Sequence, residues 1–411
     1  MEEKRQRPPI WLMSLSNVPF GLTGGFCGVI FPDLLAAHGI PTGQIASITA
    51  VIFSPSFWAF LIAPMLDVRL SRRTYALIFG FITALAVGVA VANPDHLGLV
   101  EAVMLAGFLA ASLYAGAVGG WIGSLINKEQ DGELGIWFSV MNLGAGGLMM
   151  VLAGQVLHRF SPSVSAIVIA GTIMLPMVSF LAIPSPSLDP QVARENYRRF
   201  FRGVASLLRV REVQKALVLF ILPAASFALT SVLGGAGKDF SASPQTVSLF
   251  AGIGSTIAGI IGSFLLFPFV RRFALRPLYL GIGVVGALFT LSLVALPRTP
   301  RSFAIAITGE NLLQALSFSA GNAITFEVIG PNNPFAATLF TLLVSVANLP
   351  LSYMQFFDGR GYDRGGLTGC YITDAGMSIA ACIFLAWLLS RWRRDRKPVD
   401  LPLKPVSDDA N

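Results

Sequence analysis

Residues 63–73 read APMLDVRLSRR and join two long apolar stretches of the chain. Each of these stretches can cross the hydrocarbon core of a bilayer, which is about 30 Å thick and takes roughly 20 apolar residues in a helix. Similar stretches follow on both sides. They are continuously apolar instead of alternating with period two, which favours helices over a membrane barrel. We predict twelve membrane-spanning helices, at residues 11–36, 42–66, 74–93, 98–125, 134–157, 163–183, 214–236, 244–269, 275–296, 302–326, 335–357 and 369–391.

The composition of the 411-residue chain points the same way. Hydrophobic residues make up 54% of the chain and charged residues only 12%, whereas a soluble domain has about 25% charged residues. The net charge of +7 suits a nucleic-acid partner, but the apolar stretches make a lipid bilayer the expected partner, with no nucleic acid. Cys27, Cys370 and Cys382 include no close pair, which excludes a disulfide framework and a CxxC metal site. The sequence predicts an all-α integral membrane protein that is not an enzyme.

The distribution of Lys and Arg predicts the topology. Of the 29 basic residues, 23 fall in the two terminal segments and in the loops that lie on the same side as the termini. By the positive-inside rule that side is cytoplasmic. We therefore expect a multi-pass protein of a bacterial-type inner membrane, with both termini in the cytoplasm and its basic segments against the anionic inner leaflet.

The two halves of the chain resemble each other in sequence. Pro64 and Tyr75 align with Pro268 and Tyr279 at an offset of 204 residues, which indicates a duplicated six-helix unit. The longest polar segment lies between the halves, and its basic tract predicts an amphipathic helix on the membrane surface. The expected domains are an N-terminal six-helix bundle at 1–183, a cytoplasmic basic linker at 184–213, a C-terminal six-helix bundle at 214–392 and a cytoplasmic tail at 393–411.

The quoted segment resembles the loop between helices two and three of the major facilitator superfamily, whose pattern is GxxxDRxGRR. Asp67 stands at the position of the acid, and Arg72 and Arg73 match the terminal basic pair. Ala63 replaces the glycine, Val68 replaces the first arginine, and one extra residue separates the acid from the basic pair. The resemblance implies the fold of twelve helices in two pseudo-symmetric bundles. It also implies that the acid and the basic pair form a conformational latch through charge-assisted hydrogen bonds. The alternative is that the two arginines only set the topology.

A longer stretch resembles one subgroup of this superfamily. Residues 56–67, SFWAFLIAPMLD, are similar to the FLWAPLLDR stretch of AmpG-like permeases, a group that includes acetyl-coenzyme A transporters and some siderophore importers. Residues 39–45 resemble the outer turn that precedes this stretch in the group. The resemblance implies proton-driven import of a cell-wall fragment or another sizeable small molecule.

Carboxylates at membrane depth are the candidates for proton coupling. A charge at the centre of a membrane helix costs about 2.5–3.5 kcal/mol, so a residue kept there needs a reason. Glu310 is the deepest acid, and Gln314 and Ser317 share its helix face, which predicts a polar stripe facing a water-filled cavity. We predict Glu310 as the proton acceptor; the alternative is a packing hydrogen bond to a neighbouring helix. Asp33 and Glu101 lie nearer the outer ends of their spans, as coupling residues of the cavity mouth or as interfacial residues, and Asp374 has the same position.

Several amides inside the spans are candidates for binding the substrate, although each could instead bridge two helices. Asn142 and Asn348 are the preferred pair because they correspond in the two halves. The full set of candidate substrate-binding residues is Asn17, Asn142, Asn311, Gln314, Asn322 and Asn348.

Together these features predict a secondary active transporter that imports a small organic solute by alternating access. No nucleotide-binding motif is present, so the proton gradient is the expected energy source and no cofactor or metal is expected. No Lys or Arg lies deep in a span, which favours neutral, zwitterionic or cationic cargo over strongly anionic cargo. A monomer is expected. The alternatives are a multidrug or metabolite exporter of the same fold and a membrane sensor that transports nothing.

Overall fold

A computed structural model describes residues 8–185 and 206–394, and within these ranges the chain is helical with no β-strand. Most of the predicted linker, with its basic tract, and nearly all of the predicted tail lie outside the described residues.

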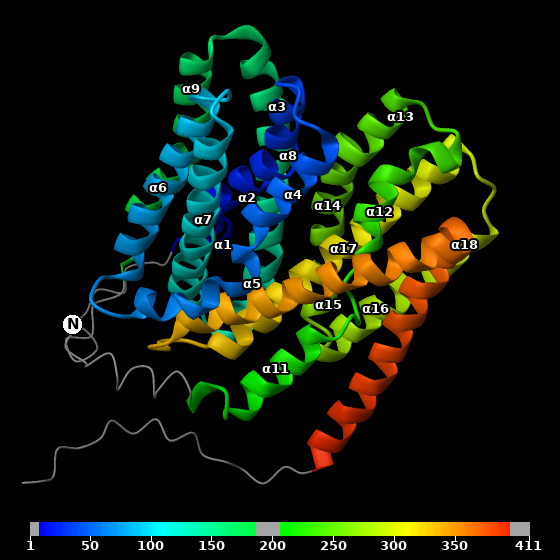
Figure 1. Ribbon diagram of the computed structural model, residues 1–411. Helices are drawn as coiled ribbons and strands as arrows, with labels where there is room; N and C mark the ends of the chain where they lie inside the picture. The colour runs from blue at the N-terminus through cyan, green and yellow to red at the C-terminus, as the bar shows by residue number, and fades with distance from the viewer. Residues whose placement is uncertain (1–7, 186–205, 395–411) are drawn as a thin grey trace, which may run out of the picture.

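The helices of the first half form one bundle (Figure 1). The first predicted span consists of α1, α2 and α3, which are joined by a 3-10 turn and a π turn, and the second span consists of α4 and α5. Four single helices follow. The bounds are Ile10–Ser14 for α1, Val18–Gly25 for α2, Phe31–Ala37 for α3, Thr42–Phe53 for α4, Pro55–Trp58 for α5, Arg72–Ala92 for α6, Leu97–Leu125 for α7, Asp131–Arg159 for α8 and Pro162–Met174 for α9.

The second half forms the other bundle. Its seventh span is broken into α11 and α12, and its eighth span is made of α13, α14 and α15. The bounds are Arg211–Ile221 for α11, Leu229–Gly235 for α12, Pro244–Ser248 for α13, Ser255–Leu265 for α14, Phe267–Val270 for α15, Leu275–Ser292 for α16, Pro300–Ile329 for α17 and Ala336–Arg394 for α18.

Ten helices of the described chain are long and apolar enough to cross a membrane. The last of them, α18, loses its helical dihedral angles at Gly365 and Gly366, so it makes two passes. The left-handed φ of +59° at Gly366 suits glycine, which has no side chain to clash. The broken span of α11 and α12 makes one further pass. The predicted all-α fold of twelve spans in two bundles is confirmed.

The break in the seventh span has a local cause. Pro223 supplies no backbone N–H for the helix, and Phe227 adopts a left-handed φ of +50°, which is unusual for a bulky residue. Residues 222–228 therefore leave the helical path between α11 and α12.

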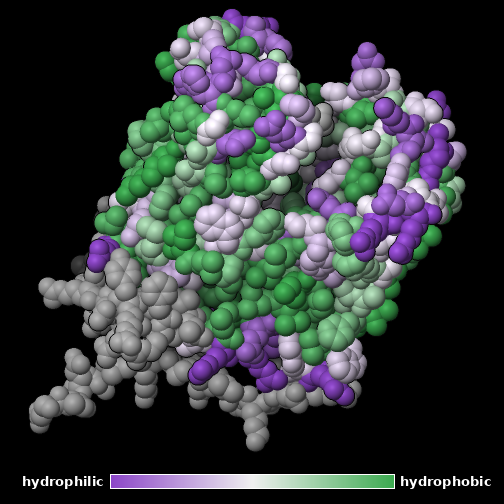
Figure 2. All heavy atoms as spheres, viewed as in Figure 1, coloured by the Kyte–Doolittle hydropathy of each residue, from purple (hydrophilic) through white to green (hydrophobic). Residues whose placement is uncertain are grey.

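The two bundles meet through corresponding helices. In one contact α8 packs against α14 and α17, and in the other α18 packs against α7 and the short helices after α4. Hydrophobic residues cover a broad band of the molecular surface, and hydrophilic residues gather towards its two ends (Figure 2). We call the end that carries Arg72, Lys128 and Arg271 the basic end, and the opposite end the outer end.

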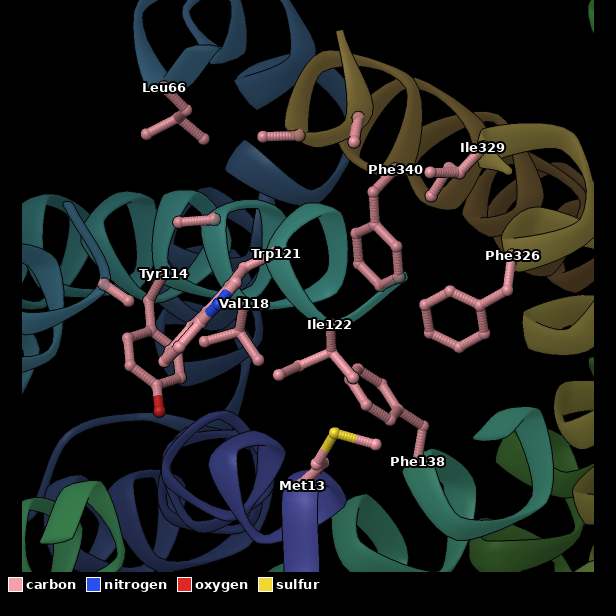
Figure 3. Close-up of a cluster of buried hydrophobic side chains, with 14 of the residues drawn as sticks. Met13, Leu66, Tyr114, Val118, Trp121, Ile122, Phe138, Phe326, Ile329 and Phe340 are labelled. Atoms are coloured by element: carbon pink, nitrogen blue, oxygen red, sulfur yellow. The ribbon is translucent and has the colours of Figure 1, made fainter. Parts of the chain in front are cut away.

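At the basic end the hydrophobic core is continuous between the bundles. Phe138 of α8 lies edge-on to Phe326 of α17 with 4.9 Å between ring centroids, and Phe340 of α18 packs 5.7 Å from Phe326 (Figure 3). Towards the outer end the bundles diverge, and a hollow opens between them (Figures 1 and 2). The structure is therefore closed at the basic end.

We predict that Gly120→Val prevents this closure. A Cβ at Gly120 would overlap the backbone of Ala336 and Ala337 across the two bundles, and a backbone neighbour cannot move aside as a flexible side chain can. Spin labels at Leu70→Cys and Phe273→Cys should report a longer distance in this variant. Both label positions are exposed, and the three native cysteines are buried.

Gly171→Val is the matched control, because a Cβ at Gly171 would meet no atom within 4 Å. If both variants keep the distance of the unmodified protein, close approach of the bundles at Gly120 does not control closure.

Candidate functional site

Asp67 ends the loop helix η4 (Ala63–Asp67), and its carboxylate binds the start of α18 in the other bundle. Its Oδ1 accepts a hydrogen bond of 3.2 Å from the amide of Ala337. Its Oδ2 accepts bonds of 2.9 Å from the amide of Thr338 and 2.7 Å from the hydroxyl of that residue. The first amides of a helix lack partners within the helix and carry a partial positive charge. An acid of the first half therefore caps a helix of the second half.

Arg72 adds a second connection between the halves. Its Nε donates to Asp67 Oδ1 at 2.7 Å, and its Nη2 donates to the carbonyl oxygens of Asn333 and Pro334 at 2.8 and 2.9 Å. Asp67 is only 7% exposed, so this charge-assisted pair is largely shielded from water. We call Asp67, Arg72 and the first turn of α18 the latch.

Local structure aims the two side chains of the latch. Ser71 is the N-cap of α6, and its hydroxyl accepts from the amide of Thr74, which places Arg72 at the first helical position. The chain reverses before this cap through Arg69, whose φ is +68°. The turn lets Arg72 face back towards Asp67.

The sequence-predicted latch residues divide into two groups. Asp67 and Arg72 join the halves. Arg73 takes part in no hydrogen bond or ion pair within the described residues. The structure therefore places the second arginine of the basic pair outside the latch in this state.

Arg276, in the first turn of α16, has two acidic partners in the second half. Arg276 pairs with Glu212 at 2.8 Å and with Glu327 at 3.3 Å, and Glu212 also pairs with Lys215 at 2.6 Å. Burial alone would raise the pKa of Glu212. The hydrogen bond from Lys215 and the charge of Arg276 outweigh burial and hold that pKa below its usual value. These ion pairs stay inside the second half.

A cavity of about 930 Å³ lies beside these ion pairs, between the start of α8 and the second half. Its lining combines acidic and basic side chains, including Lys128, Asp131, Arg271, Arg276 and Glu327. The cavity is thus a charged space at the basic end of the bundle interface.

Glu310, predicted as the proton acceptor, lies inside the second bundle and is fully buried. The Thr290 hydroxyl of α16 lies 2.6 Å from its Oε1, and its Oε2 has no hydrogen-bond partner within the described residues. Two further carboxylates interact with it electrostatically, Asp358 and Asp374. These two are 0% and 4% exposed. We call Glu310, Asp358 and Asp374 the carboxylate cluster.

Gln314 and Ser317, which follow Glu310 on the same helix face, contact the broken seventh span. The sequence had predicted that this polar stripe faces a water-filled cavity. Gln314 donates to the carbonyl oxygen of Phe227 at 3.2 Å and to the Thr230 hydroxyl at 3.1 Å. Ser317 donates to the carbonyl oxygen of Ala225 at 2.6 Å. The physical reason is that the break frees backbone carbonyls, which need donors inside a membrane.

Three other candidate amides also bind within the protein. Asn17 donates to the carbonyl oxygen of Phe138 at 3.1 Å, and Asn311 donates to that of Ile307 at 2.7 Å. Asn322 of α17 donates to the Ser139 hydroxyl of α8 at 3.0 Å, so it joins the two bundles. In this state Asn17 and Asn322 connect helices, which was the alternative to substrate binding, whereas Asn311 bonds within its own helix α17.

The remaining candidates have less defined surroundings. Asn142 and Asn348, the symmetric pair, are half-buried on α8 and α18, and neither side chain has a hydrogen-bond partner within the described residues. Glu101 is half-buried on α7 and Asp33 is exposed on α3. The structure does not bring these two acids into the carboxylate cluster.

Sequence reasoning missed Asp358. The eleventh span was expected to end at residue 357, whereas the helix continues to Gly365. Asp374, expected at the cavity mouth or at the membrane interface, is buried in the protein. One signal could have identified Asp358. It follows the buried residues Leu343 and Met354 at helical spacing, so the buried face of the helix extends through it.

The sequence matches no protein-family model and no curated protein sequence. Solved structures are similar in fold. The E. coli fucose:proton symporter FucP superposes with a TM-score of 0.72 at 14% identity, covering 92% of this chain and 98% of the symporter. The human organic anion transporter MFSD10 gives 0.68 at 15% identity, with 92% and 100% covered. A bacterial homologue of the iron transporter ferroportin, in an outward-facing state, gives 0.63 at 16% identity, with 95% and 100% covered.

A second FucP structure is described as a major facilitator superfamily transporter in the outward conformation, and it superposes with a TM-score of 0.69 at 15% identity. It covers 92% of this chain and 98% of its own. The chain described here therefore has the fold of major facilitator superfamily transporters.

Proposed function

We propose that the protein is a secondary active transporter that imports a small organic solute together with protons by alternating access. The observation that carries this proposal is the latch. A carboxylate of one bundle caps a helix of the other at the basic end, while the bundles diverge at the outer end. Such contacts are strong enough to hold one state and few enough to break, as an exchange between two states requires.

Other observations support the proposed coupling ion and the proposed cargo. The buried Glu310 supports a proton as the coupling ion, with Asp33 and Glu101 as candidate groups of the outer path. FucP, a structural neighbour, is a proton symporter. The resemblance of residues 56–67 to AmpG-like permeases supports a cell-wall fragment or a siderophore-like molecule as the cargo. In this proposal the protein is a monomer without a cofactor or enzymatic activity, and its basic end faces the cytoplasm of a bacterial-type inner membrane.

We predict that Asp67→Asn opens the basic end. The neutral amide keeps the shape of the side chain but loses the charge that holds Arg72 and the helix end, and a hydrogen bond to a charged group contributes about 1.5–3 kcal/mol. The open population should rise roughly ten- to a hundredfold. The spin-label pair at Leu70→Cys and Phe273→Cys measures this population directly.

Two arginine variants serve as a matched pair for this test. Arg72→Gln should open the basic end as Asp67→Asn does, whereas Arg73→Gln should not. Within the described residues Arg72 donates hydrogen bonds to the other half and Arg73 donates none. Equal effects of the two arginine variants would contradict the latch as described.

We predict that an imposed proton gradient drives uptake into proteoliposomes. Labelled peptidoglycan fragments and siderophores are the probes, and an uncoupler should abolish their accumulation. Glu310→Gln should remove the dependence on the gradient because the amide cannot take up the proton. Asp363→Asn, an exposed position on α18, is the control and should behave as the unmodified protein.

Two outcomes would contradict this proposal. If the labelled probes still accumulate in the presence of the uncoupler, transport is not coupled to protons. Expulsion of lipophilic cations without uptake of either probe would favour the exporter.

A further inference from the structure

Three buried carboxylates interact electrostatically inside the second bundle although they come from different helical segments. Glu310 lies on α17, Asp358 on the part of α18 before Gly365, and Asp374 on the part after Gly366. The two parts of α18 pack closely, since a Cβ at Gly361 or at Gly369 would overlap the backbone of the other residue. This close contact lies between Asp358 and Asp374 along the chain, so it holds the segments that carry them side by side, and the two acids interact electrostatically.

Within the part of the chain that the structure describes, the cluster has no positively charged partner. Four of its carboxylate oxygens are buried and have no hydrogen-bond partner within the described residues: Glu310 Oε2, both oxygens of Asp358, and Asp374 Oδ1. No ion pair of the described chain includes any of these acids. Three carboxylates cannot all keep their charge in a nonpolar interior without a cation, so protons or another cation must neutralise them.

The described side chains around the cluster do not neutralise its three carboxylates. Cys370 and Tyr371 of α18 are buried and interact electrostatically with acids of the cluster, and the Thr290 hydroxyl of α16 lies against Glu310. Arg298, at the outer end, is engaged elsewhere: it donates to the Thr368 hydroxyl at 3.0 Å and lies over the ring of Tyr371. The other charged residues of the described elements around the cluster lie near the ends of the helices or on exposed turns of α18. They are Arg211, Glu212, Lys215, Lys238, Asp239, Arg276, Arg301, Glu327, Arg360, Asp363, Arg364 and Arg391.

The hydroxyl of Thr290 indicates which cation binds. Its Oγ1 lies 2.6 Å from Glu310 Oε1 and 3.1 Å from the carbonyl oxygen of Gly286. A hydroxyl has one proton to donate, so with an ionised Glu310 only one of the two contacts is a hydrogen bond. A proton on Glu310 satisfies both, because the acid then donates to Thr290 and Thr290 donates to Gly286. The described residues also contain no group of His, Cys, Asp or Glu with metal-binding geometry.

The next helical turn connects the cluster to the broken seventh span. Gln314, four residues after Glu310, holds the carbonyl oxygen of Phe227. Ser378, four residues after Asp374, donates to the carbonyl oxygen of Pro223 at 2.8 Å. Both α17 and the last part of α18 therefore donate a hydrogen bond to the segment 222–228, each from a residue one helical turn after an acid of the cluster.

We propose that Glu310, Asp358 and Asp374 form one shared proton-binding site, whose occupancy sets the position of residues 222–228 through Gln314 and Ser378. The inference rests on the proposed proton-coupled transport, for which it adds two residues and a mechanical connection. Deprotonation places like charges on facing helices, which pushes α17 and the last part of α18 apart and moves the donors that hold the break.

Infrared titration of the purified protein in lipid nanodiscs tests the site without any substrate. The unmodified protein should show a protonated-carboxyl band that disappears as the pH rises. The band should be lost or shifted in Glu310→Gln, Asp358→Asn and Asp374→Asn. The exposed Asp363→Asn is the matched control and should leave it unchanged. Absence of the band in the unmodified protein would overturn the proposal, and so would a titration in all three cluster variants that is identical to that of the unmodified protein.

Sodium chloride in place of choline chloride, at constant ionic strength, separates the proton from a metal ion. The titration should be the same in both salts. Loss of the band on adding Na⁺ would show that the cluster binds a metal ion and would overturn the proposed proton site. Because the test needs no cargo, it is independent of transport. A titrating cluster in a protein whose uptake ignores the proton gradient would contradict the proposed function and leave the site standing.

The connection to the break is tested by alkylation of Ser226→Cys, followed by mass spectrometry of the labelled peptide. Ser226 is buried in the break, and its hydroxyl has no hydrogen-bond partner within the described residues. The labelling rate should change over the pH range in which the band titrates. It should be independent of pH in the variant that carries all three neutral substitutions. The same pH profile in both proteins would overturn the connection.

Discussion

The closed basic end depends on one carboxylate. Asp67 satisfies amides at the start of α18 that no group of that helix can satisfy, and it does so from the opposite bundle. Its charge also orders Arg72, which reaches the carbonyl oxygens before the same helix. The contact at Gly120 and the rings of Phe138, Phe326 and Phe340 pack around this connection. They exclude water and so strengthen the electrostatic interaction that they surround.

The second bundle is organised around a different constraint, the seventh span. Its break exposes backbone carbonyls within the membrane, and the protein satisfies them with side chains of α17 and α18. The same two helices carry the buried acids one turn away. The two halves therefore differ: the first half supplies the carboxylate of the latch at the basic end, and the second half holds the carboxylate cluster.

Much of the fold could be predicted from the sequence because burial in lipid imposes strong local rules. Each span must be long and apolar, so counting apolar stretches located the passes even where α18 merges two of them. Asp67 and Arg72 could be identified because their loop pattern is distinctive, and Glu310 because a charge at its depth is rare. Asp358 was missed because the glycines around residue 365 resemble a loop, although the helix continues to that point. Partners such as Glu212 and Glu327 for Arg276 are distant in sequence, and no local pattern identifies them.

The sequence by itself determined the helical class, the number of passes, the side that carries the basic residues and the residues most costly to bury. These follow from the hydropathy and charge of consecutive residues, which act locally. Only the tertiary structure decided that Arg72 and not Arg73 completes the latch, and that Gln314 binds the break in the seventh span and not open water. It also decided that Glu310, Asp358 and Asp374 are buried in the same bundle. These outcomes depend on which helices pack together, and hydrogen bonds and ion pairs act over a few ångströms between residues that are far apart along the chain.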